Sequence, residues 1–268
     1  MQSYSRKKKV PRATRSPAEV LQKRSSLLDK EKAIDQALAA KTQKLSEDPK
    51  KFFTQLVGFQ PTNYQADFIK SFIDNQFVAA RWCRQSGKSW IISALLLWYA
   101  LTHKDSYIAV VGPSWRQTRL IIRRITFFLR NVPPKLYYKP LKTVIRFVNG
   151  SCVEAFPCNP DTIRGPTLNV VYCDEMNFIP NDEEMYDAIL FTLSATNGKF
   201  VCSSTPWNTD SIFYKIFNHK DYEDFAKSHV TWREAEEPNG PLKKAILDKI
   251  RKQFADDPWR WKREMEAD

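Results

Sequence analysis

The most informative run of this chain is residues 77–97, FVAARWCRQSGKSWIISALLL. Its first four residues are apolar and typical of a strand, and from Trp90 onward the composition favours a helix. Gly87-Lys88-Ser89 therefore falls at a strand-to-helix turn. In such a turn backbone N–H groups point at an anion, and the helix dipole favours its negative charge. Lys88 can reach the β- and γ-phosphates of a nucleotide, and the Ser89 hydroxyl can ligate Mg²⁺.

A second run, residues 170–175 with the sequence VVYCDE, has the pattern of a buried strand that ends in two carboxylates. Asp174 would hold Mg²⁺ or its water, and Glu175 would polarise the attacking water. The Gly-Lys-Ser run lacks the first glycine of the usual G-x-x-x-x-G-K-[ST] motif, because Trp82 stands there. Both runs occur in the order of a nucleotide-hydrolysis site, and the pair is far more specific than either run alone.

The composition is that of a globular protein: 268 residues, 43% of them hydrophobic and 13% aromatic. No apolar run approaches the ~20 residues that span a bilayer, and the N-terminus lacks the apolar part of a secretory signal. We therefore expect no membrane partner and a cytosolic protein. The five cysteines include no C-x-x-C pair, which argues against a structural zinc site. Cys83, Cys173 and Cys202 are expected to be buried, reduced thiols.

The formal net charge is +12, and half of it lies in the first 15 positions, which hold six basic residues and no acidic one. Residues 1–15 are expected to form a flexible basic arm that is attracted to polyanions. Ser16-Pro17-Ala18-Glu19 has the form of a capping box, so a helix is expected over residues 16–49. That helix either packs on the body or binds a partner.

From about residue 50 the chain alternates between patterns typical of strands and of helices. Helices are expected over 64–74, 88–102, 117–130 and 183–193. Strands are expected over 77–81, 107–111, the run before Asp174, 199–203 and 225–232, with a β-hairpin of 143–147 and 152–156 joined through Asn149-Gly150. This alternation predicts an α/β core over residues 50–232, a mainly parallel sheet flanked by helices. Residues 233–268 are expected to form a mostly helical C-terminal subdomain.

Five motifs, in order, resemble the ATPase domain of the large terminase subunit, the DNA-packaging motor of tailed bacteriophages and related viruses. They are Pro61-Thr62-Asn63-Tyr64-Gln65, Arg84-Gln85 before Gly-Lys-Ser, Thr162-Ile163-Arg164-Gly165, the Asp-Glu strand, and Ser203-Ser204-Thr205-Pro206. The resemblance covers roughly residues 50–265. It implies a RecA-like P-loop NTPase fold.

The resemblance also implies a role for each motif in binding ATP with Mg²⁺. Gln65, with Tyr64 nearby, would contact the adenine; Gln85, Ser86, Gly87, Lys88 and Ser89 would form the phosphate loop. Asp174 would hold the metal, Glu175 would be the catalytic carboxylate, and Ser204-Thr205 would couple hydrolysis to movement. Arg84 would contact the γ-phosphate within its own chain, whereas Arg164 would act as an arginine finger on a neighbouring subunit. Which arginine completes the transition state stays open.

For the whole molecule the resemblance implies ATP hydrolysis that drives double-stranded DNA into a procapsid in the host cytoplasm. The partners would be the portal protein, the small terminase subunit and further copies in a ring, five in this family, although this chain alone is not expected to form the ring. Family members continue into an RNase H-like nuclease, which is not expected here. Four carboxylates near the C-terminus are expected on a solvated helix face rather than in a nuclease metal cluster: Asp256, Asp257, Glu264 and Glu266.

Two other functions fit parts of the pattern. A two-lobed helicase or restriction translocase shares the glutamine motif and the Asp-Glu strand, but it needs a second motor lobe, and only one motif set fits in this chain. A basic DNA-binding scaffold with a degenerate nucleotide site is the other, and the intact Lys88, Ser89, Asp174 and Glu175 argue against it.

Overall fold

A computed structural model describes residues 47–268 and, before them, positions 22, 25, 28–30, 32–34, 36, 37, 40 and 44, all of which are helical. The basic arm 1–15 and the capping box at 16–19 lie outside the described residues. In the part of the chain that the structure describes, no helix is long and apolar enough to cross a membrane.

A seven-stranded sheet in the order β3-β4-β2-β5-β6-β1-β7 forms the centre of the molecule. Its pairs are parallel except for β3 with β4, the predicted hairpin, so the mainly parallel sheet is confirmed. The strands are β1 (Phe77–Trp82), β2 (Tyr107–Val111), β3 (Val144–Arg146), β4 (Cys152–Ala155), β5 (Val170–Asp174), β6 (Lys199–Ser204) and β7 (Ala226–Val230).

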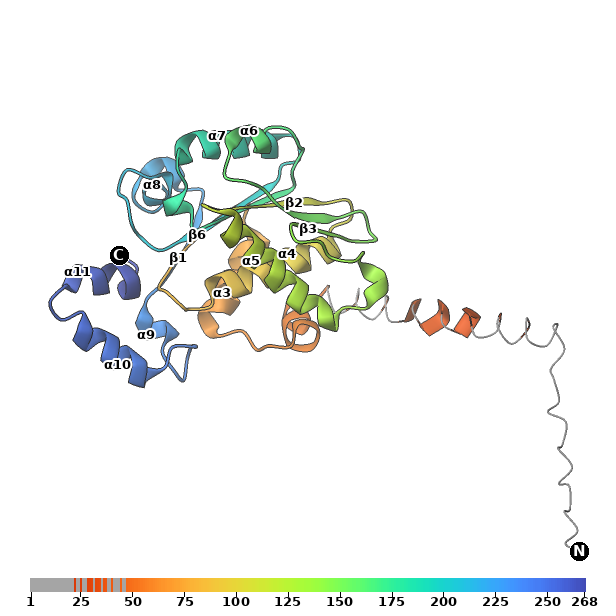
Figure 1. Ribbon diagram of the computed structural model, residues 1–268, viewed down its shortest axis with the longest axis horizontal. Coiled ribbons are helices and arrows are strands. Elements are labelled where there is room, and N and C mark those ends of the chain that lie inside the picture. Colours follow the sequence, from red (N-terminus) through yellow and green to blue (C-terminus); the bar gives the residue numbers. More distant parts are fainter. Residues whose placement is uncertain are drawn as a thin grey trace, which may run out of the picture.

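Helices cover both faces of the sheet (Figure 1). One face carries α3 (Asn63–Asp74), α4 (Lys88–Thr102) and α5 (Trp115–Phe128); the other carries α6 (Pro160–Ile163), α7 (Asp182–Ser194) and α8 (Ile212–Asn218). Side chains of a strand alternate between the two cores: in β5, Val170 and Tyr172 belong to the first, Val171 and Cys173 to the second. The short α2 (Pro49–Lys51) and a π-helix (Phe52–Val57) precede α3.

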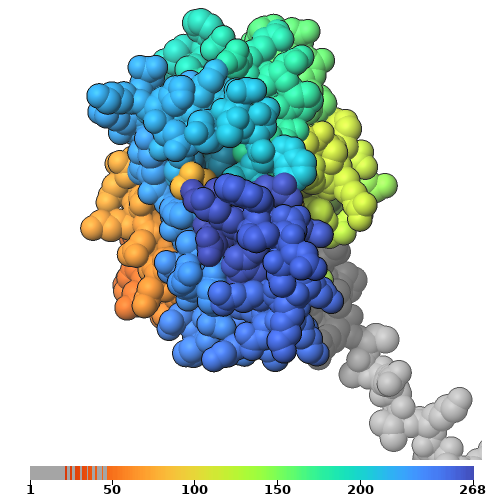
Figure 2. All heavy atoms as spheres, turned by 90° about the vertical axis from the view of Figure 1, so that its left-hand side faces the viewer, coloured from red at the N-terminus to blue at the C-terminus, as the bar shows by residue number. Residues whose placement is uncertain are grey.

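The C-terminal segment, residues 232–268, contains α9 (Trp232–Ala235), α10 (Lys244–Gln253), α11 (Pro258–Trp261) and a final π-helix (Lys262–Glu266). Figure 2 shows it as a continuous lobe, coloured mid to dark blue. Leu247, Trp261 and Met265 join the first core, and the rings of Trp232 and Trp261 meet edge to face at 5.7 Å between centroids. The lobe is therefore packed on the sheet-containing body through apolar contacts.

Candidate nucleotide-binding site

Three neighbouring parallel strands end at one edge of the sheet and bring together segments far apart in sequence. Strand β6 lies between β1 and β5, so the loop after β1, the carboxylates at the end of β5 and the end of β6 converge there. They line a pocket of about 340 Å³. Its lining consists of residues 83–90 together with Arg124, Glu175, Thr205 and Pro241.

The loop after β1 has the backbone that an anion cradle needs. Gln85 and Gly87 adopt left-handed conformations with φ of 61° and 86°. A Cβ on Gly87 would lie 2.7 Å from the Gln65 side-chain nitrogen, so this position requires glycine. The Ser86 hydroxyl donates to the Cys83 carbonyl at 2.7 Å, which ties the loop to itself. Gly87 is the N-cap of the 15-residue helix α4, whose N-terminus faces the pocket.

Trp82 explains why the first glycine of the motif is missing. It is the last residue of β1 rather than part of the loop, and its side chain is fully buried. Its indole N–H donates to the Ser228 hydroxyl on β7 at 2.8 Å, and its ring meets those of Tyr64 and Phe68 edge to face. A large side chain here fills core space and leaves the phosphate loop free.

Tyr64 and Gln65 contact the loop after β1 on the side away from the pocket. The Tyr64 hydroxyl donates to the Ser86 backbone carbonyl at 2.7 Å. The side-chain oxygen of Gln65, Oε1, accepts from the Thr62 N–H at 3.0 Å in a capping box that starts α3. Neither residue lines the 340 Å³ pocket. The adenine contact predicted for them stays a prediction.

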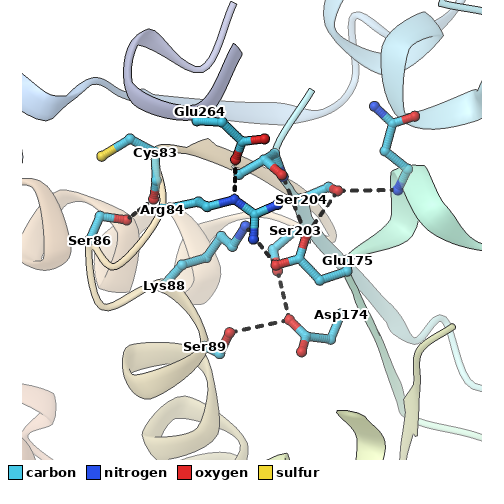
Figure 3. A network of polar contacts seen from close by, with 12 residues as sticks. Cys83, Arg84, Ser86, Lys88, Ser89, Asp174, Glu175, Ser203, Ser204 and Glu264 are labelled. Atoms are coloured by element: carbon cyan, nitrogen blue, oxygen red, sulfur yellow. Dashed lines mark hydrogen bonds and ion pairs between the residues drawn. The ribbon is translucent and has the colours of Figure 1, made fainter. Parts of the chain in front are cut away.

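Asp174 and Ser89 form the part of the site that suits a metal ion. The Ser89 hydroxyl lies 3.3 Å from Asp174 Oδ1 (Figure 3). The same oxygen accepts from the Tyr172 hydroxyl at 2.6 Å. Asp174 is only 5% exposed, and burial followed by the charge of Glu175 raises the pKa of its carboxyl. A cation would relieve this unfavourable burial. Among the described residues no group of three or more His, Cys, Asp or Glu could hold a metal, but Mg²⁺ needs only one or two protein ligands beside phosphate oxygens and water.

Glu175 lies at the junction of all three strand ends (Figure 3). Its backbone is left-handed, with φ of 51°, which turns the side chain away from the course of β5. One carboxylate oxygen lies 3.5 Å from Lys88 Nζ. The other accepts from the Ser204 hydroxyl at 3.2 Å and from the Thr205 N–H at 3.4 Å. Thr205 lines the pocket, and its hydroxyl oxygen is buried without a hydrogen-bond partner.

Arg84 lines the pocket but is held by the C-terminal segment. Its Nε donates to the Glu264 carboxylate, and its backbone N–H donates to the Glu264 carbonyl at 3.0 Å (Figure 3). Glu264 also pairs with Arg263 at 3.1 Å, and its side chain is 12% exposed. The prediction that Glu264 lies on a solvated face is therefore wrong, because tertiary packing brings it to the phosphate loop.

Arg164 lies apart from the pocket. It forms ion pairs with Asp161 at 2.7 Å and Glu184 at 3.1 Å, and its side chain is 48% exposed. It does not line the 340 Å³ pocket. Its predicted action on a neighbouring subunit stays a prediction, since the structure holds a single chain.

Three residues at or beside the pocket were not predicted from the sequence. Tyr172 stands two residues before Asp174, and the two-residue period of a strand could have placed it on the same side. Arg124 and Glu264 reach the site from α5 and the final π-helix, and no local pattern marks either residue. The buried thiols of Cys83, Cys173 and Cys202 are confirmed, and burial raises the pKa of Cys83 to about 12.

Known proteins share this fold. The chain is 25% identical over 166 residues to the tripartite terminase subunit 3 of equine herpesvirus 2, an overlap that is 53% of this chain and 24% of that protein. The large terminase ATPase domain of Thermus phage P74-26 superposes with a TM-score of 0.62 at 22% identity, covering 81% of this chain and 96% of that one. The large terminase of another thermophilic bacteriophage, in complex with ADP, gives 0.57 at 16% identity, covering 72% and 50%.

A family model supplies the assignment. The model described as "Terminase large subunit, T4likevirus-type, N-terminal" matches residues 82–266, which contain the phosphate loop, both carboxylates and all but the last two residues of the C-terminal segment. This match spans well over half of the chain, and the protein therefore belongs to the large terminase subunit family.

Proposed function

We propose that this protein hydrolyses ATP with Mg²⁺ and that hydrolysis drives the translocation of double-stranded DNA. The observation that carries the proposal is the position of Glu175, which contacts Lys88 of the phosphate loop on one side and Ser204 and Thr205 at the end of β6 on the other. A single carboxylate thus joins the residue that binds phosphate to the segment assigned to coupling. The chain spans about a quarter of the herpesvirus relative, so activities of whole terminases are proposals here.

In the proposed mechanism Lys88 exchanges partners. Without nucleotide its ammonium group neutralises Glu175; with nucleotide the phosphates take over the ammonium, and Glu175 becomes free to polarise water. Mg²⁺, held by Ser89 and Asp174, would neutralise charge on the phosphate oxygens. The thermophilic-phage terminase solved with ADP supports a nucleotide as the ligand of this pocket.

The exchange of partners at Lys88 could also move the end of β6. Glu175 accepts hydrogen bonds from Ser204 and Thr205 only while its carboxylate points at β6. A shift of Glu175 toward water would weaken these hydrogen bonds and allow the backbone at the end of β6 to move. Trp207, shortly after that strand, is 56% exposed. The differential contacts of the ATP and ADP states would thereby bias two arrangements of the body.

Partners and location follow from the family and from charge. The net charge of +12 favours duplex DNA as the cargo. We propose the portal protein, the small terminase subunit and a ring of copies, five in this family, as partners in the host cytoplasm. We also propose that this chain is no nuclease: Glu264 is engaged by Arg84, Glu266 by Arg233 at 3.7 Å, and Asp257 caps α11.

Steady-state hydrolysis of ATP, with and without double-stranded DNA, tests the proposal. We expect Mg²⁺-dependent hydrolysis that duplex DNA stimulates and that Lys88→Ala abolishes. Absence of hydrolysis in the wild type under all conditions would favour a DNA-binding scaffold with a degenerate nucleotide site.

A further inference from the structure

Besides Lys88 and Arg84, a third cation lines the nucleotide pocket: Arg124, from helix α5. No motif of the chain assigns it a role. Ile121, one turn earlier, and Ile125, the next residue, are fully buried, so the helix at this point is fixed against the sheet. Arg124 flanks this buried face at intermediate exposure, whereas its neighbour Arg123 is exposed.

Arg84, Arg164 and Arg124 differ in their ion-pair partners. Arg84 is engaged by Glu264, and Arg164 is engaged by Asp161 and Glu184 outside the pocket. Within residues 47–268 the Arg124 guanidinium has no ion-pair or hydrogen-bond partner. Since no carboxylate or carbonyl among these residues accepts from the Arg124 guanidinium, its N–H groups can donate to a ligand in the pocket.

The charges that line the pocket also favour an anionic ligand. Arg84, Lys88 and Arg124 line it against one carboxylate, Glu175. Asp174 lies just behind; burial raises the pKa of its carboxyl, and the charges of Lys88 and Arg124 act against that shift. An excess of cations around a fixed N–H cradle suits a ligand with several negative charges, and a guanidinium is suited to bind phosphate with two hydrogen bonds.

We propose that Arg124 binds the terminal phosphate of the nucleotide within its own chain and thereby distinguishes ATP from ADP. The proposal rests on the nucleotide function proposed above. Arg124 reaches the pocket from α5, whereas the loop assigned to the inner phosphates leads into α4, so the two groups belong to different elements. ATP, but not ADP, would then connect α4 to α5.

Calorimetric titration with ATPγS and with ADP, each with Mg²⁺, tests this assignment in Arg124→Met, which keeps the length of an apolar stem. We expect ATPγS to bind about 10- to 100-fold more weakly, because the variant loses hydrogen bonds to a charged group, and ADP to bind within about twofold of wild type. Arg124→Lys should recover part of the loss. Arg123→Ala, the exposed neighbour, is the matched control and should bind both nucleotides like wild type.

The outcomes separate this inference from the proposed function. Equal weakening of ATPγS and ADP, or no change in either, would overturn the role of Arg124 while wild-type binding and its loss in Lys88→Ala still support a nucleotide site. If the wild type binds neither nucleotide, the proposed function fails and the inference with it. Thermal unfolding of each variant identifies losses that come from misfolding.

Discussion

Asp174 and Glu175 are adjacent in sequence but have different surroundings. Asp174 is buried and accepts from Tyr172, whereas Glu175 turns through a left-handed backbone toward Lys88 and the pocket. A carboxylate in a dry, hydrogen-bonded position suits a metal ligand, and one that faces the pocket suits a general base. The backbone turn between them thus separates two chemical roles.

Substituting Asp174 should give a pH-dependent change in stability. Burial raises the pKa of Asp174 above its ordinary 3.8, so its contribution to folding is present below that value and is lost as pH rises through the raised pKa. Asp174→Asn keeps an acceptor for Tyr172 without the charge. In thermal unfolding with EDTA the variant should be more stable than wild type at pH 7, with an advantage that shrinks toward pH 4. A difference independent of pH would contradict the assigned cause.

Among the single residues of the site, the sequence predicted the positions of those that lie in continuous motifs. Lys88, Ser89 and Glu175 could be placed because a strand-to-helix turn and a strand end position them locally. Arg124 and Glu264 could not, since only the packing of α5 and of the last π-helix brings them to the loop. The position of Trp82 in β1 became clear only with its buried ring and its bond to Ser228.

Most elements could be predicted because their patterns are long. Strand β2 and helix α4 have the predicted bounds, and α5 begins two residues before expectation because Ser114 caps it. The expected strand 225–232 ends at Val230, since Thr231 starts α9 with a capping box. Helix α8 was missed: its seven residues are too few to show a period.

The contact between the phosphate loop and the C-terminal segment makes a prediction about elements. Arg84 pairs with Glu264 and is 54% exposed, so the pair should contribute about 1 kcal/mol or less to the free energy of unfolding. A double-mutant cycle of Arg84→Ala and Glu264→Gln in urea measures this coupling. Arg263→Ala, which removes the other partner of Glu264, is the control.

Nucleotide should compete for the same guanidinium. We expect ATPγS to speed amide exchange at Arg84, whose N–H donates to the Glu264 carbonyl, and to reduce the measured coupling. Slower exchange and an unchanged coupling energy would mean that the C-terminal segment does not respond to the nucleotide.

Across the whole molecule, the uneven charge predicts how DNA binds. Six of the basic residues lie in the arm 1–15, and no base-reading motif is visible, so contacts should go to phosphates. Deleting residues 1–15 should flatten the log–log dependence of DNA affinity on salt by up to ~5 if all six charges touch phosphates. An unchanged slope would reassign the arm to a protein partner.

Arg164 makes a prediction about assembly. If it reaches a neighbouring pocket, activity should rise faster than linearly with protein concentration, and a finger is worth ~10³–10⁵ in rate. Arg164→Ala mixed with Lys88→Ala should regain activity, because a mixed interface joins one intact pocket to one intact finger. Arg124→Met mixed with Lys88→Ala should not, since both residues line one pocket. No rescue with Arg164→Ala, despite confirmed assembly and an inactive Arg84→Ala, would assign the finger to Arg84.

Single-turnover hydrolysis in Glu175→Gln shows whether Glu175 activates water for ATP hydrolysis. The amide keeps an acceptor for Ser204 and Thr205 but cannot take a proton, so ATPγS should bind as in wild type while turnover of ATP falls by ~10²-fold or more. Hydrolysis at the wild-type rate in Glu175→Gln, with nucleotide bound, would mean that Glu175 does not activate the attacking water.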